Sequence, residues 1–283
     1  MSLNSVNTNI GAQVALQSLN LTSTQLAATE KQISTGFRVA DATDDGAAYA
    51  VALRVRSDVG AITSANQQLG GVQGLLSATS SALKDVSTLA NSLRNVLVSL
   101  ANGNTSGNQR TQYIAQYKSD LQNVKSDIQN ASYNGKTLIG NITGSTGTFA
   151  KVAVTTNESG STYGIATFGG SALYGALALG ATTLASATLA GAAITATGSF
   201  ITALNAIGTQ LNGYGNATNY VNNQISYNSD KIDSLNSGLG ALVDANLAQE
   251  SALLQSLQIR QQLGTQALSL ANQAPQTLLS LFK

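Results

Sequence analysis

The hydrophobic pattern of this chain predicts helices at both of its ends. On a helix that turns by about 100° per residue, the apolar residues of segment 243–283 form two stripes on roughly opposite sides. The first stripe contains Leu247, Leu254, Leu257 and Leu268, and the second contains Ala252, Ile259, Leu263 and Leu270. Because one partner covers only one stripe, the pattern predicts a helix that packs against two partners.

The first thirty-odd residues carry the same double pattern. One face holds Leu3, Val6, Ile10, Val14, Leu21 and Ala28, and the other holds Ala15, Leu19, Leu26 and Ile33. If the two terminal helices pack through one stripe each, their second stripes stay uncovered. Soluble proteins seldom leave long apolar surfaces in water, so the pattern predicts self-assembly through these helices. The expected polymerisation interface is Leu3, Val6, Ile10, Val14, Leu19, Leu21, Leu26, Ile33, Leu247, Leu254, Leu257, Ile259, Leu263, Leu268 and Leu270.

Between the ends, apolar residues repeat with heptad spacing in three runs, which is typical of helices packed side by side. The first run begins after Thr43-Asp44-Asp45, where a hydroxyl and two carboxylates suit a helix N-terminus, and ends in the turn-forming residues 102–108. Its positions are Ala48, Val51, Val55, Ile62, Ala65, Leu69, Val72, Leu76, Leu83, Val86, Ala90, Leu93, Leu97 and Leu100. The second run covers 114–128 and the third covers 204–242.

Glycines complicate the helical pattern at two places. Gly70, Gly71 and Gly74 lie inside the first run, and each disfavours a helix by about 1 kcal/mol relative to alanine. Packing must therefore hold this stretch, and a flexible point is the alternative interpretation. Gly238 and Gly240 predict a hinge before the C-terminal helix.

The middle of the chain has a different composition. Residues 148–156 and 161–168 are rich in β-branched and aromatic residues between glycines, which predicts short strands. Residues 173–198 are an uncharged Ala/Thr/Ser/Gly/Leu tract without a periodicity that predicts structure. We therefore expect a mainly α fold, with a long antiparallel coiled-coil bundle formed by both chain ends and a small β-containing insertion. The expected domains are terminal helices 1–40 plus 243–283, a bundle 41–139 plus 203–242, and a variable outer excursion 140–202.

Charge and composition argue against several classes of function. The chain has 14 basic and 13 acidic residues, a balance that favours neither nucleic acid nor an anionic membrane as partner. It has no cysteine and no histidine, so disulfides, thiolate metal sites and the most common acid–base catalyst are excluded. We expect no enzyme activity, no metal and no cofactor.

The two chain ends hold few charges, which bears on localisation. Residues 1–37 contain only Glu30 and Lys31 as charged side chains, yet they lack the basic and apolar regions of a cleaved signal peptide. Residues 261–282 carry no charge, but five glutamines, Asn272 and Pro275 argue against a membrane span. Adjacent carboxylates at Asp44 and Asp45 could serve acid–base or metal chemistry, although helix capping explains them better.

Three stretches of the sequence resemble bacterial flagellin. They are residues 2–9 (SLNSVNTN), residues 33–48 (ISTGFRVADATDDGAA) and the ending from Gln262 onward, and the resemblance extends over 1–139 and 203–283. The chain departs from the family where flagellins usually carry Asn-Asp-Gly-Ile, because it has Leu69-Gly70-Gly71-Val72 there.

The resemblance implies a structural subunit that polymerises into the flagellar filament and serves as a propeller. It further implies export without a cleaved signal, with an export chaperone, the type III export apparatus, the filament cap and hook-associated proteins as partners, and an extracellular location. The alternatives are a hook–filament junction protein, which shares such terminal helices, and a surface adhesin or glycan-binding protein that uses residues 140–202.

The resemblance also bears on recognition by the Toll-like flagellin receptor. Flagellins that trigger this receptor usually carry a charged surface on the helix before the Ala-Asn-Gly turn, here Ala101-Asn102-Gly103. The alignment keeps one arginine, Arg94, but places Ser92, Asn95 and Gln116 where a second arginine and two acids are usual. We therefore expect a vestigial receptor-contact surface.

Overall fold

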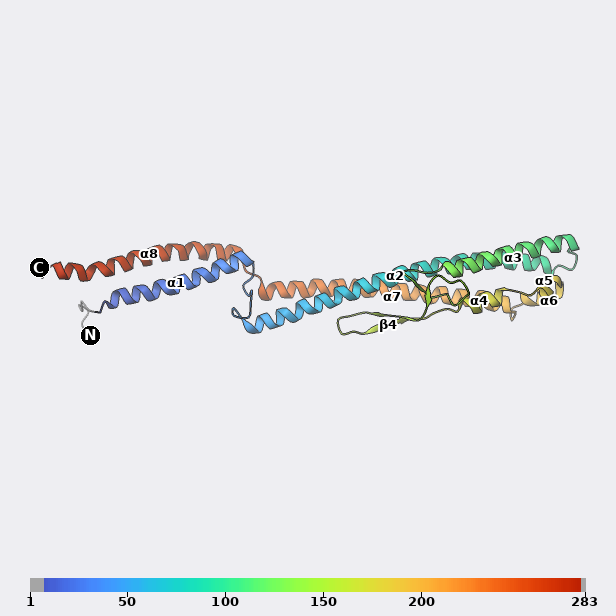
Figure 1. The fold of residues 1–283 in the computed structure, drawn as a ribbon, viewed down its shortest axis with the longest axis horizontal. Coiled ribbons are helices and arrows are strands. Elements are labelled where there is room, and N and C mark those ends of the chain that lie inside the picture. The colour runs from blue at the N-terminus through green and yellow to red at the C-terminus, as the bar shows by residue number, and fades with distance from the viewer. Residues whose placement is uncertain (1–7, 281–283) are drawn as a thin grey trace. The chain divides into compact units, whose positions relative to one another are not determined.

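The computed structural model describes residues 8–280, with side chains described to residue 273, and the chain divides into two compact units. One unit consists of Met1–Ser57 with Asp233–Lys283, and the other is Asp58–Ile232. Long helices account for most of the described chain, and short strands occur only within residues 136–165 of it (Figure 1). The mainly α fold expected from the sequence is confirmed.

In the first unit, helices α1 (Ile10–Thr35) and α8 (Leu247–Ser280) lie side by side and antiparallel (Figure 1). The Asn9 side chain caps α1 by accepting a hydrogen bond from the Ala12 N–H at 3.0 Å, and it donates another to the Ala271 carbonyl at 2.7 Å. Gly36 ends α1 in the left-handed conformation, with φ of 74°. In the sequence, Ser34-Thr35-Gly36 predicts a helix stop, and this end confirms it, because glycine adopts the left-handed conformation without steric cost.

Helix α2 (Gly46–Ala101) runs without a break through the three glycines that suggested a flexible point. It begins after Asp45, whose carboxylate accepts hydrogen bonds from the Ala47 and Ala48 N–H groups at 3.0 Å each. A Cβ at Gly74 would lie 2.6 Å from Cζ of Tyr133, so any other residue here would displace the tyrosine ring from its observed position. The packing of Tyr133 thus accounts for one of the glycines that weaken the helix locally.

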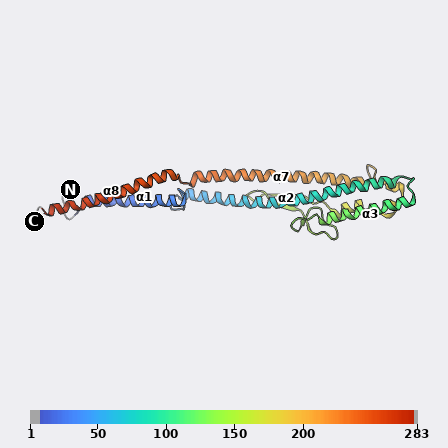
Figure 2. The same cartoon turned by 90° about the horizontal axis from the view of Figure 1, so that it is seen from above.

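The second unit is built on the expected heptad helices. Helix α3 (Gly107–Asn130) begins with a capping box between Ser106 and Gln109, and helix α7 (Ser199–Val243) contributes the third run (Figure 2). The core cluster includes Leu69, Leu76, Leu83, Leu93, Leu97 and Leu100 from α2, Tyr117, Val124 and Ile128 from α3, and Ile207, Tyr214 and Val221 from α7. Heptad spacing therefore identified the main core correctly.

The segment between α3 and α7 forms two small sheets and three short helices. Strands β1 (Lys136–Thr137) and β2 (Thr148–Phe149) pair in parallel, whereas β3 (Val152–Thr155) and β4 (Thr162–Ile165) form an antiparallel hairpin with Val152 opposite Ile165. The predicted strands are confirmed. The uncharged tract forms α4 (Gly170–Leu177), α5 (Ala181–Ala185) and α6 (Ala187–Ala193).

This inserted segment packs into the main core of the unit. Val154, Ile165, Leu177 and Leu184 are all buried in the same cluster as the heptad leucines. Two buried tyrosines also donate hydrogen bonds to its backbone. The Tyr214 hydroxyl donates to the Leu138 carbonyl at 3.2 Å, and the Tyr117 hydroxyl donates to the Leu177 carbonyl. Burial raises the pKa of Tyr214 to about 12. The excursion is therefore integral to the bundle, while the three-part domain division stays a prediction.

The predicted hinge at Gly238 and Gly240 is wrong. Helix α7 continues through both glycines to Val243, and the break before α8 falls at residues 244–246. Val243 is 1% exposed and packs with Val39, Ala48 and Ala52 in a small second core. This burial offsets the intrinsic cost of the glycines, so that helix length follows packing rather than local propensity.

Candidate assembly interface

The facing sides of α1 and α8 form a regular heptad seam. Residues that are buried or half-buried recur at spacings of three and four on both helices. They are Ala12, Ala15, Leu19, Thr22, Leu26, Thr29 and Ile33 on α1, and Glu250, Leu254, Leu257, Gln261, Gly264, Leu268 and Ala271 on α8. The seam therefore takes up one predicted stripe of each helix.

The second stripes of both helices are exposed. Val14 and Leu21 on α1 keep 60% and 61% of their surface, and Leu263 and Leu270 on α8 keep 58% and 67%. Among the described side chains of the two helices, the large apolar residues that are exposed are Ile10, Val14, Leu16, Leu21, Leu247, Leu253, Ile259, Leu263 and Leu270. The predicted positions Leu3 and Val6 lie outside the described residues. The structure thus presents a row of uncovered aliphatic side chains on each terminal helix.

Two details of these stripes differ from the sequence pattern. The sequence pattern places Leu247 in the same stripe as Leu254 and Leu257, but Leu247 is the first residue of α8, is 50% exposed and lies before the seam begins at Glu250. Leu16 and Leu253 lie outside both predicted stripes, although both are more than 40% exposed. On a helix that turns by about 100° per residue, each of them falls between the two stripes, so the stripe pattern does not include them.

The seam itself is poor in large apolar residues. Thr22 and Thr29 occupy buried positions on α1, and Oγ1 of Thr22 donates to the Ser18 carbonyl of its own helix at 2.9 Å. On α8, Gly264 lies where a Cβ would come within 3.3 Å of Leu19, and one carboxylate oxygen of Glu250 is buried without a hydrogen-bond partner. A seam of this kind buries less apolar surface than a leucine-rich coiled coil and stabilises the helix pair weakly.

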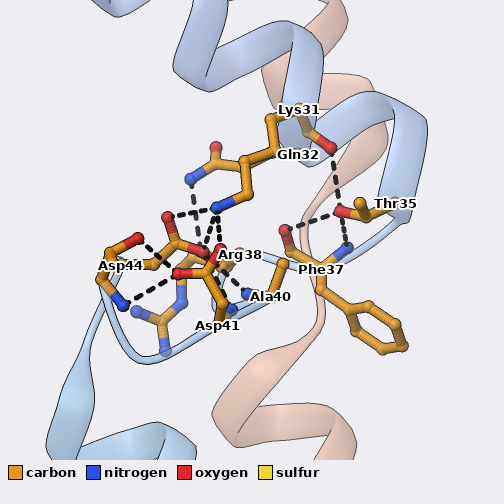
Figure 3. Close-up of polar contacts among 9 residues, drawn as sticks. Lys31, Gln32, Thr35, Phe37, Arg38, Ala40, Asp41 and Asp44 are labelled. Carbon is orange, nitrogen blue, oxygen red and sulfur yellow. Dashed lines mark hydrogen bonds and ion pairs between the residues drawn. The ribbon is translucent and has the colours of Figure 1, made fainter.

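A charged cluster holds the connector between α1 and α2. Nζ of Lys31 lies 2.7 Å from Oδ2 of Asp41 and 2.8 Å from Oδ1 of Asp44 (Figure 3). Asp44 also accepts hydrogen bonds from the backbone N–H groups of Ala40 and Asp41. The Lys31 ammonium lowers the pKa of both carboxyls, and they in turn raise the pKa of Lys31.

This cluster revises the interpretation of the paired carboxylates. Asp45 caps α2 as expected, but Asp44 binds Lys31 and the connector backbone instead. The sequence feature that points to this cluster is Lys31, because it is the one basic residue of an almost uncharged segment and so calls for a nearby acidic partner. Its two partners lie ten and thirteen residues further along the chain. The side chains of Lys31, Asp41 and Asp44 keep 27% to 48% of their surface, so that each ion pair is screened by solvent and stabilises the fold little.

The same connector is joined to the end of α7. The backbone N–H of Arg38 donates to the Val243 carbonyl at 2.7 Å, and its guanidinium donates to the Leu242 carbonyl. Phe37 forms an isolated bridge with Asp244, and the guanidinium of Arg56 lies 5.5 Å from the centre of the Phe37 ring. The connector after α1 is therefore bonded to residues 242–244, which precede α8.

The expected receptor surface also contains a carboxylate, that of Asp120, which is not among the residues predicted from the sequence. Oδ2 of Asp120 accepts a hydrogen bond from Ser92 at 2.8 Å, and Oδ1 accepts one from Gln116 at 2.7 Å. Asp120 is 6% exposed, whereas Arg94 is exposed on α2. The structure thus brings Ser92 and Gln116 together around a buried acid and leaves Arg94 in solvent.

Other classes of site are not seen in the described part of the chain. Residues 8–280 contain no group of three His, Cys, Asp or Glu side chains that could hold a metal ion. No helix among them combines the length and apolarity needed to cross a membrane. What the chain offers is a heptad bundle and paired terminal helices with uncovered apolar stripes. That combination defines a structural protein of the filament-forming class.

Comparison with known proteins identifies the family. The model of the bacterial flagellin N-terminal helical region matches residues 6–143, and that of the C-terminal helical region matches residues 194–282. Flagellin FljM of Caulobacter vibrioides is 35% identical, and FljK of the same organism is 34% identical, each over 100% of both chains. A flagellin of Brucella melitensis is 32% identical over 99% of both chains. The chain belongs to the bacterial flagellins, and it is a structural subunit of the flagellar filament.

A solved structure agrees with the fold. The crystal structure of Bacillus cereus flagellin superposes with a TM-score of 0.50 at 18% sequence identity, covering 57% of this chain and 88% of that chain.

Proposed function

We propose that this flagellin polymerises by burying the exposed stripes of α1 and α8 against other copies of the chain. The observation that carries the proposal is the row of exposed aliphatic residues on helices that have almost no charge. The interface includes Ile10, Val14, Leu21, Ile259, Leu263 and Leu270, together with Leu3 and Val6 from outside the described residues. The seam residues Leu19, Leu26, Ile33, Leu254, Leu257 and Leu268 hold the two helices together within each subunit.

The free energy of assembly comes from many weak contacts between subunits rather than from one strong contact. Covering an aliphatic side chain that is about half exposed contributes on the order of 1 kcal/mol. Nine such residues lie on the described parts of the two helices, and every added subunit buries another set. Part of this gain offsets the entropy lost on association. The surplus accumulates along a polymer because each subunit contacts several neighbours.

The location and the partners follow from the same proposal. The filament lies outside the cell, and the chain reaches it through the flagellar type III export apparatus with an export chaperone, the filament cap and hook-associated proteins. The chain has no cysteine and a single proline, so its refolding after export requires no disulfide and few slow prolyl isomerisations. The filament transmits torque as a propeller. No catalytic step is part of this function.

Substitution of an exposed leucine tests the interface. Leu263→Asp and Leu270→Asp each place a charge in the stripe. No basic residue lies within seven residues of Leu270, and Arg260, three residues before Leu263, would itself have to be buried to stay paired, so we expect filament growth to be abolished. Gln262→Asp adds the same charge to an exposed polar position next to Leu263 and serves as the control. Electron microscopy and sedimentation report assembly, and circular dichroism reports the fold. Normal filaments from both leucine variants would overturn the assignment.

A further inference from the structure

A polar stripe on α7 contacts the β3–β4 hairpin. Its residues are Tyr220, Gln224, Asn228 and Lys231, which recur at helical spacing and so share one face of the helix. The Tyr220 ring stacks on Tyr163 of β4 at 4.0 Å between ring centres. Nζ of Lys231 pairs with Oε1 of Glu158 in the hairpin loop at 2.5 Å. The stripe therefore contacts both the strands and the loop of the hairpin.

Asn228 is at the centre of these contacts and is fully buried. Its Nδ2 donates to the Thr156 carbonyl at 2.9 Å and to Oδ1 of Asn66 at 2.8 Å, and its Oδ1 accepts from Gln224 at 3.0 Å. Gln224 also donates to the Thr156 carbonyl at 3.2 Å. One amide thus joins α7, α2 and the end of β3.

The position of Asn228 in the sequence is unusual, because it interrupts the third heptad run at a position where an apolar residue is expected. An apolar heptad seam has similar contacts after a shift of seven residues, and so it discriminates weakly between axial registers. A buried amide has its hydrogen-bond partners in one register only, and any shift would leave it unsatisfied at considerable cost. Asn228 meets Asn66 across the helices and Thr156 in the hairpin in the observed register alone.

We propose that the α7 stripe is a docking site for the β3–β4 hairpin, and that this docking, through Asn228, locks the axial register of α7 against α2. In this view the hairpin acts as a clamp on the helix pair. The exact fit of the amide contributes specificity as well as stability, because any other arrangement leaves the buried groups that it bonds without a hydrogen-bond partner. All the contacts lie within the Asp58–Ile232 unit.

The absence of cysteine from the chain allows a direct test of register. Nε2 of Gln73 donates to Oδ1 of Asn222 at 2.8 Å, so Gln73→Cys with Asn222→Cys reports the observed register through a short bis-maleimide cross-linker. Gln73→Cys with Ser229→Cys or with Gly215→Cys reports a shift by one heptad in either direction. A Cβ at Gly215 meets no atom within 4 Å, so this cysteine is tolerated.

Asn228→Leu is the test substitution, and Thr218→Leu is its matched control. Thr218 is the other polar interruption of the same run, but its hydroxyl bonds to the Tyr214 carbonyl of its own helix and not to the hairpin. We expect Asn228→Leu to form both shifted cross-links, and the control to form the 73–222 cross-link alone. Tryptic cleavage after Lys151, next to β3, should be about tenfold faster in Asn228→Leu, because hairpin opening becomes easier.

A second variant acts from the hairpin side and leaves Asn228 in place. Glu158→Ala combined with Tyr163→Ala removes the ion pair and the ring stack, and should raise both cleavage and shifted cross-linking. This variant decides the question if circular dichroism shows that Asn228→Leu does not fold. Cross-linking confined to 73–222, with cleavage no faster than in the control, would overturn the proposal in either background.

Discussion

The two helical regions of this flagellin follow the same heptad rule and use it differently. In the Asp58–Ile232 unit, Leu83, Leu93 and Leu97 are fully buried against neighbouring helices. Among the described residues of α1 and α8, Leu257 is the one large apolar side chain buried to the same degree, whereas Leu270 keeps 67% of its surface. A heptad pattern therefore predicts helix pairing in both regions. Only the burial of the side chains distinguishes a fully packed core from an apolar surface that is still exposed in the monomer.

The largest expected difference between the regions is in local stability. In monomer kept at low concentration, amides of α1 and α8 should exchange with solvent about a thousandfold faster than those of α2 near Leu83, because the terminal seam buries little apolar surface. Hydrogen exchange read by mass spectrometry measures this ratio. Equal protection in the two regions would mean that the terminal pair is stable without partners.

Leucine-to-alanine substitutions sharpen the comparison with the same chemical change at two sites. Leu83→Ala should lower the free energy of unfolding of the monomer by about 3 kcal/mol, because it leaves a cavity in a buried core. Leu270→Ala should leave the monomer unchanged and raise the critical concentration for polymerisation. Urea titration and sedimentation separate the two effects. A destabilised monomer in Leu270→Ala would show that its exposed stripe already has a partner within the chain.

The bundle surface around Asp120 gives a third test. The sequence resemblance leads us to expect weak stimulation of the Toll-like flagellin receptor, since Arg94 keeps its charge but Ser92, Asn95 and Gln116 are neutral. Ser92→Arg with Asn95→Glu and Gln116→Glu should raise the response of a receptor reporter assay about tenfold through new charge pairs. The glutamate at 116 lies beside Asp120, so Ser92→Arg with Asn95→Glu alone is the control for repulsion there. Full stimulation by the parent chain would contradict the expectation.

The smallest expected effect is the pH dependence of the two ion-pair sites. Lys31 lowers the pKa of Asp41 and Asp44, and Lys231 lowers that of Glu158. A carboxyl whose pKa is lower in the folded state contributes stability above its unfolded pKa, and loses it as the pH falls through the folded pKa. The monomer should therefore keep its stability from neutral pH to about pH 4.5 and lose it below. In acid unfolding curves, Lys31→Gln and Lys231→Gln should each show a smaller loss of stability between neutral and acidic pH than the parent. Curves identical to that of the parent would rule out the ion pairs as the source of the loss.

Much of the helical architecture followed from the sequence by itself. The heptad runs identified α2, α3 and α7, Gly36 marked the end of α1, and the double stripes of the terminal segments anticipated one covered and one exposed face. These features depend on spacing along a single helix, and spacing is visible in the residue order.

The tertiary structure decided whatever depends on residues that are distant in sequence. The uncharged tract folds as α4 to α6 because the bundle covers Leu177 and Leu184, and Gly238 and Gly240 stay helical because Val243 packs beside them. Asp44 binds Lys31 rather than capping a helix, and Asn228 meets Asn66 and Thr156 from elements 162 and 72 residues away. Local patterns specify periodicity and turns, whereas the partner of a buried amide or of a lone charge depends on which surfaces the completed fold brings together.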